Sequence, residues 1–163
     1  MDEFTAKKIG EVLAFARIGH ETLEKGREAL EKLFGGVGSI DKYINENALH
    51  ARALEDTADA YPEVKDIILA KADKTAGKLR QMLDLYVGDE WDNAIELLEW
   101  HGFFEGAAIV HWYLVQGATE KAKVKRVSTF ANSVIEFHEK FLMKVAFKLK
   151  ETASPTKEEA IVN

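Results

Sequence analysis

Hydrophobic residues recur along this chain at intervals of three and four, the spacing of one face of an α-helix. Stretches with the apolar–polar alternation of a strand do not stand out anywhere in the sequence. The strong helix formers alanine, leucine, glutamate and lysine dominate the chain. The pattern therefore predicts an all-α protein.

Interruptions of this pattern divide the chain into five long helices. The glycine-rich stretch 35–39, Pro62, Gly88 and Gly117 supply the interruptions, because glycine ends helices and proline suits the first turn of a new one. The helices that this predicts span residues 4–34, 40–60, 62–88, 90–116 and 119–150.

Three polar residues at these interruptions predict how the following helices begin. Ser39 and Asp89 each stand just before a predicted helix, where a side-chain oxygen can accept a hydrogen bond from a free backbone N–H. Thr119 opens the last helix, directly after the glycine that closes the one before it.

Long helices joined by short loops predict an up-and-down bundle of four to five helices in a single domain, residues 1–151. A chain of 163 residues is long enough to form its own core, since it buries roughly 70% of its extended surface. The segment 152–163 contains Pro155, several charges and few apolar residues, which predicts a disordered tail.

The segment 97–117, LLEWHGFFEGAAIVHWYLVQG, is apolar on almost every side of the predicted helix. A helix of this kind must be covered on all sides. It is therefore either the central helix of the bundle or a helix that packs against a second subunit, and we expect a homodimer or higher homo-oligomer. Gly102 and Gly106 would allow another helix to approach closely, as would Gly19 and Gly26 in the first helix.

Composition and charge narrow the classes of partner. The net charge of −6 makes nucleic acid an unlikely partner, because such binding needs a basic surface. Cysteine is absent, so disulfides and thiolate metal sites are excluded. Two glutamates and two histidines within 97–117 argue against a membrane span, and the N-terminus lacks the pattern of a signal peptide. We therefore expect a cytoplasmic protein with no membrane partner.

Histidines and glutamates near the middle of several predicted helices form a candidate metal site. Carboxylates and imidazoles on facing helices are how bundles hold paired iron or manganese ions. Such a centre would give the protein a redox or oxygen-handling role. The candidate ligands are His20, Glu24, Glu46, His50, His101, Glu105 and His138.

Two observations weigh against this metal site. The Glu-x-x-His motif of ferritin-like di-iron proteins is absent before every histidine, and the number of Glu–His neighbours is what the abundance of glutamate produces by chance. A histidine on an apolar face is more often a buried, neutral, hydrogen-bonded side chain. If Glu105 faces the core it needs a metal, another cation, a proton or a mate such as His101, because a lone buried carboxylate costs several kcal/mol.

The leading interpretation is a self-associating helical bundle that acts as an interaction or scaffold module, with no catalytic residues. The alternative is a ferritin-like carboxylate/histidine redox protein that binds iron or manganese. A third possibility is a small-molecule binder whose apolar cavity is lined by Trp100, Phe104 and Trp112.

Overall fold

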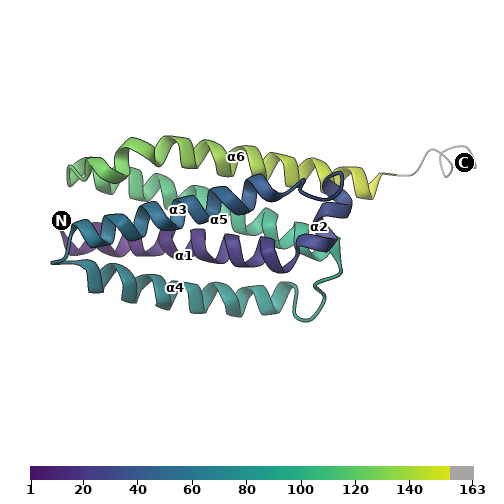
Figure 1. The fold of residues 1–163 in the computed structure, drawn as a ribbon, viewed down its shortest axis with the longest axis horizontal. Helices are drawn as coiled ribbons and strands as arrows, with labels where there is room; N and C mark the ends of the chain where they lie inside the picture. The colour runs from purple at the N-terminus through teal and green to yellow at the C-terminus, as the bar shows by residue number, and fades with distance from the viewer. Residues whose placement is uncertain (155–163) are drawn as a thin grey trace, which may run out of the picture.

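The computed structural model describes residues 1–154, which fold into a bundle of six helices (Figure 1). The five long helices run alternately up and down, which confirms the predicted all-α bundle. Most of the tail predicted to be disordered lies outside the described residues, but its first two residues belong to the last helix. The helices are α1 (Glu3–Lys25), α2 (Arg27–Phe34), α3 (Asp41–Ala60), α4 (Lys65–Tyr86), α5 (Ala94–Lys121) and α6 (Lys125–Ala153).

The helix predicted over 4–34 is interrupted at Gly26, so the prediction of one continuous helix is wrong. A Cβ atom on Gly26 would stand only 3.0 Å from a methyl group of Leu97, so the glycine lets α5 approach the interruption closely. The short α2 then crosses the end of the bundle and ends at Gly35, whose φ of 111° is left-handed.

Two predicted helix caps are wrong. Ser39 does not cap α3: the cap residue is Ile40, and the buried Ser39 hydroxyl has no partner among the described residues. Asp89 does not cap α5, because the chain makes a further turn before the helix begins. Asn93 caps it instead, and its Oδ1 accepts hydrogen bonds from the backbone N–H groups of Ile95 and Glu96.

The predicted boundary at Gly117 and Thr119 is also wrong, because α5 continues through both residues to Lys121. Thr119 is fully buried, and its hydroxyl donates to the carbonyl oxygen of Val115 at 2.8 Å. A glycine inside a helix costs roughly 1 kcal/mol, which this burial can offset. The chain reverses at Lys123, the one non-glycine residue with positive φ among those described.

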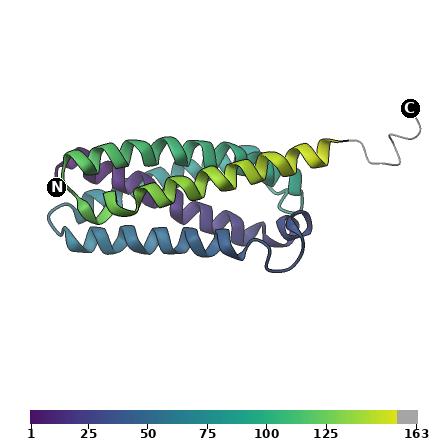
Figure 2. The ribbon, with the colours of Figure 1, turned by 90° about the horizontal axis from the view of Figure 1, so that it is seen from above.

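The central helix of the bundle is α1, which packs against α3, α4 and α5. Figure 2 shows α3 and α5 along opposite long edges of the molecule. Two glycines of α1 permit this close packing: a Cβ on Gly10 would lie 2.4 Å from the carbonyl oxygen of Ile68 in α4, and one on Gly19 would lie 2.5 Å from Oδ1 of Asn47 in α3. The segment 97–117 is therefore not the central helix.

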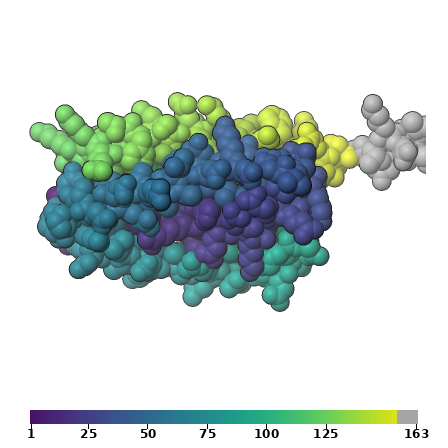
Figure 3. Space-filling view, viewed as in Figure 1, coloured from purple at the N-terminus to yellow at the C-terminus, as the bar shows by residue number. Residues whose placement is uncertain are grey.

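The core consists of two hydrophobic clusters, one toward each end of the bundle. On α3, Asn47 and His50 lie between Ile44 of one cluster and Leu54 of the other. On α6, His138 occupies the equivalent position. In the space-filling view of Figure 3, α3 covers the front of the molecule beneath α6. The side chains of Asn47, His50 and His138 are buried.

Candidate functional site

A group of polar side chains is buried where the two hydrophobic clusters meet. It is built from three helices that are far apart in sequence, α3, α5 and α6. Polar side chains in a core are costly unless they are paired, so this group is the most unusual part of the interior. We call it the buried polar cluster; its members are Asn47, His50, His101, Glu105 and His138.

The closest contact in the cluster joins Glu105 of α5 to His138 of α6. Nδ1 of His138 donates to Oε2 of Glu105 at 2.5 Å, and both side chains are almost completely buried. The other carboxylate oxygen, Oε1, has no partner among the described residues. The partner of Glu105 is therefore His138. It is not His101, which the sequence suggested as a possible partner.

His50 connects this pair to the molecular surface. Its ring centroid is 6.0 Å from that of His138, and its Nε2 is 3.5 Å from Oε2 of the more exposed Glu46. Burial, together with the charge of His138, lowers the pKa of His50 to about 4. The ring is therefore neutral at physiological pH and available as a base or a metal ligand.

His101 is completely enclosed by apolar neighbours. Its ring lies 5.8 Å from that of Phe141 and 6.4 Å from that of Phe104, and neither ring nitrogen has a hydrogen-bond partner among residues 1–154. Burial lowers the pKa of His101 to about 3. A buried imidazole without a hydrogen bond is uncommon in a folded protein.

A groove of about 250 Å³ between α3 and α6 leads from the surface to His50. Its walls carry both acids and bases, so it has no strong preference for ligands of one charge. The residues that line it include Lys42, Tyr43, Glu46, Ser133, Glu136, Phe137 and Lys140.

The structure brings together three of the seven candidate metal ligands, His50, Glu105 and His138, whereas His101 is buried one turn before Glu105 among apolar side chains. Glu46 stands at the rim of the groove. His20 and Glu24 are engaged elsewhere: Nδ1 of His20 lies 3.3 Å from the carbonyl oxygen of Ile44, and Glu24 forms an ion pair with Arg27. Within residues 1–154, no three histidine, aspartate or glutamate side chains are arranged to hold a metal ion.

A second unusual feature lies on the outer side of α5. Glu105 is the only Asp, Glu, Lys or Arg between Glu99 and Glu120, and it is buried. The solvent-facing positions between them are consequently uncharged. We call this surface the α5 face; it exposes Phe103, Val110, Tyr113 and Leu114, with Gly106 between Phe103 and Val110 and with Gly117 three residues after Leu114.

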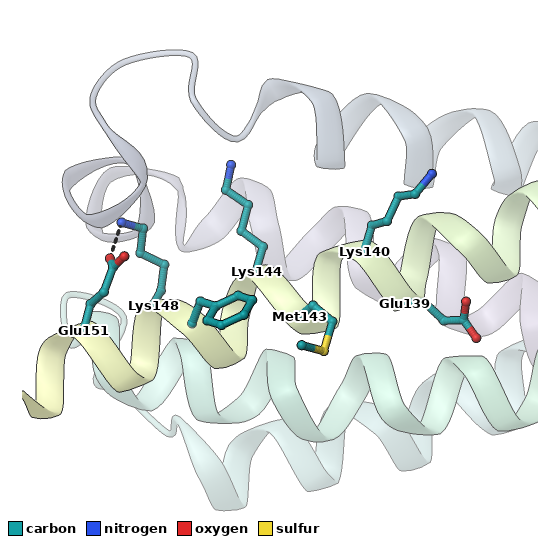
Figure 4. Close-up of a pocket in the computed structure, with 7 residues that line it drawn as sticks. Glu139, Lys140, Met143, Lys144, Lys148 and Glu151 are labelled. Atoms are coloured by element: carbon teal, nitrogen blue, oxygen red, sulfur yellow. Dashed lines mark hydrogen bonds and ion pairs between the residues drawn. The ribbon is translucent and has the colours of Figure 1, made fainter.

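The α5 face continues onto α6. The Tyr113 hydroxyl donates to Glu139 of α6 at 3.2 Å, so these two side chains meet at the surface between the antiparallel helices. One and two turns beyond Glu139, the exposed Met143 and Phe147 line a shallow groove of about 660 Å³. Figure 4 shows Met143 on the side of α6 turned toward α5, whereas Lys140 and Lys144 point the other way.

The sequence did not predict two features of these sites, the presence of Asn47 in the buried polar cluster and the exposed apolar side of α5. Asn47 belongs to the buried polar cluster, where its amide donates to the carbonyl oxygen of Tyr43 at 2.9 Å. Its position one turn before His50 was the available signal. The three aromatic residues proposed to line a ligand cavity, Trp100, Phe104 and Trp112, are all buried in the core, and their neighbours on the same helix form the exposed face.

No family model, curated protein or solved structure matches this chain. Among the helices described, none has the length and apolar content needed to cross a membrane.

Proposed function

We propose that this protein is a self-associating interaction or scaffold module of the cytoplasm, which pairs with a second copy of itself through the α5 face. The observation that carries the proposal is the uncharged surface of α5 between Glu99 and Glu120. Four large apolar side chains are exposed on it, and Val110 among them is 67% exposed.

Association would remove these side chains from water. Burying apolar surface contributes about 25 cal/mol per Å², so several such residues together supply a substantial driving force. Aromatic side chains are typical of the centres of protein interfaces, and Phe103 and Tyr113 are of this kind. Contiguous apolar patches of this sort on a monomer usually mark a contact with another protein.

The test compares the oligomeric state of two matched variants. Val110→Glu places a charge in the middle of the α5 face, whereas Leu49→Glu places the same charge on α3, at a leucine that is 58% exposed. In analytical ultracentrifugation at micromolar concentration, we expect wild type and Leu49→Glu to be dimers and Val110→Glu to be a monomer. A monomeric wild type, or a dimeric Val110→Glu, would overturn the proposal.

A second candidate is the metal-binding redox protein. What favours it is that Oε1 of Glu105 and both ring nitrogens of His101, all good metal ligands, are buried without hydrogen-bond partners among residues 1–154. Binding iron or manganese would require these side chains to rearrange, because as they stand the described residues offer no group of three ligands.

The metal content of the purified protein tests this second candidate function. Protein purified without a histidine tag from medium supplemented with iron and manganese should contain stoichiometric metal by mass spectrometry. The metal should disappear in Glu105→Ala, and it should persist in Glu24→Ala, whose carboxylate lies outside the cluster. Metal-free wild type would exclude this candidate and leave the self-association proposal untouched.

A further inference from the structure

We infer that the second copy binds with its α5 antiparallel to α5 of the first copy. A two-fold axis that passes next to Val110 relates the two copies. This inference rests on the proposed self-association and specifies its geometry. Val110 is the most exposed of the apolar residues on the α5 face, and the face extends about equally far on both sides of it.

Antiparallel pairing about Val110 brings each large side chain opposite a small residue. Residues equally distant from the axis lie at the same height, since both helices rise by the same amount per residue. Phe103 and Gly117 are each seven residues from Val110, and Gly106 and Leu114 are each four residues away. Phe103 of one copy would therefore pack over the partner's Gly117, and Leu114 over the partner's Gly106.

The glycines leave room for this packing. A Cβ atom on Gly106 or Gly117 would meet no other atom of the described part of the chain within 4 Å, so there is open space beside both glycines. Small residues at a helix crossing allow the backbones to approach closely, and large residues opposite them fill the space.

In the antiparallel dimer, the charged residues at the two ends of the α5 face lie opposite residues of opposite charge. Glu99 and Lys121, both exposed, are each eleven residues from Val110. The antiparallel dimer thus places the Glu99 carboxylate of each copy opposite the partner's Lys121 ammonium, twice by symmetry. A parallel dimer would instead place Glu99 against Glu99 and Lys121 against Lys121, which is unfavourable.

Cysteine cross-linking tests the geometry, because the chain contains no natural cysteine. Val110→Cys should oxidise to a covalent dimer in high yield, and Leu49→Cys on α3 should not. With a short bismaleimide, Glu99→Cys mixed with a tagged Lys121→Cys should give only the mixed dimer. Dimers of each variant with itself would show parallel pairing and overturn the inference.

Charge reversal provides an independent test. Glu99→Lys and Lys121→Glu should each weaken dimerisation about tenfold, since each puts like charges together at both ends. The double variant Glu99→Lys/Lys121→Glu restores opposite charges and should recover the wild-type dissociation constant. If wild type is a dimer but Val110→Cys does not cross-link, the register is wrong and self-association stands; if wild type is a monomer, both proposals fail.

Discussion

At the scale of single residues, the pair Glu105–His138 is the strongest constraint in the core. Removing one member of a buried pair leaves the other without a partner, and this typically costs about 3 kcal/mol. We therefore expect Glu105→Leu to lower the free energy of unfolding by about that amount in urea denaturation. Glu136→Leu, at an exposed position on α6, should change it by less than about 0.5 kcal/mol.

A double variant distinguishes a specific pair from two unrelated buried side chains. In Glu105→Leu/His138→Leu neither polar group is left unpaired, so the double variant should lose less stability than the two single variants added together. Strictly additive losses would mean that the 2.5 Å contact contributes no coupling.

The two neutral histidines predict how stability depends on pH. Burial lowers the pKa of His101 to about 3 and that of His50 to about 4, from an ordinary value of 6.5. Below pH 6.5 the unfolded chain therefore binds protons that the folded protein does not. Stability should be greatest above pH 6.5 and should fall as the pH drops, by about 1.4 kcal/mol per pH unit for each histidine, until about pH 4 for His50 and about pH 3 for His101.

A variant shows how much of this pH dependence of the free energy of unfolding comes from His101. His101→Leu removes one titrating group, so its free energy of unfolding should fall less steeply than that of wild type between pH 6 and pH 4, by about 1.4 kcal/mol per pH unit. His20→Leu is the matched control, since His20 lies outside the buried polar cluster. Equal slopes for His101→Leu and wild type would contradict the neutral, buried state of His101.

The sequence identified most of the buried polar cluster but not its pairing. The sequence predicted His138 and Glu105 as candidate site residues and raised the question of which side chain would pair with Glu105. Which side chain meets it depends on how α5 and α6 lie beside each other, and nothing within either helix encodes that register. The Glu105–His138 contact spans helices and could be found only in three dimensions.

At the scale of helices, two glycines show opposite roles. Gly10 lies against the α4 backbone, so Gly10→Ala should force α1 and α4 apart and lower the free energy of unfolding by about 1–3 kcal/mol. Gly77 lies in α4 with open space beside it, so Gly77→Ala should raise the free energy by about 0.5–1 kcal/mol. Urea denaturation of the two variants checks the direction of each change. If Gly10→Ala left the free energy of unfolding unchanged, the close contact between α1 and α4 would be refuted.

Helix boundaries followed from the sequence only where a local signal was decisive. The glycine-rich turn after α2 was found correctly, since glycine there has left-handed φ angles. Gly117 predicts the end of α5, but the helix continues to Lys121 because the burial of Thr119 favours another turn. Tertiary packing outweighed the local preference at this position.

At the scale of the whole molecule, the arrangement of helices decides which part of 97–117 is left on the surface. The sequence left two explanations for this apolar helix, a central position or contact with a second subunit. Because α1 occupies the centre, α5 lies at an edge, with Trp100 and Trp112 turned inward and Val110 turned outward. The composition of α5 alone could not separate these sides, since both are apolar.

The proposed self-association through this edge would also couple folding to protein concentration. A partner that binds only the folded state stabilises it by mass action, so the melting temperature of a dimer rises with concentration. For a chain of this length, a hundredfold increase should raise the melting temperature of wild type by roughly 3–5 °C. Val110→Glu, which should be monomeric, should melt at the same temperature throughout. Calorimetry on both proteins checks this. If the melting temperature of wild type did not change with concentration, the α5 face would contact only water.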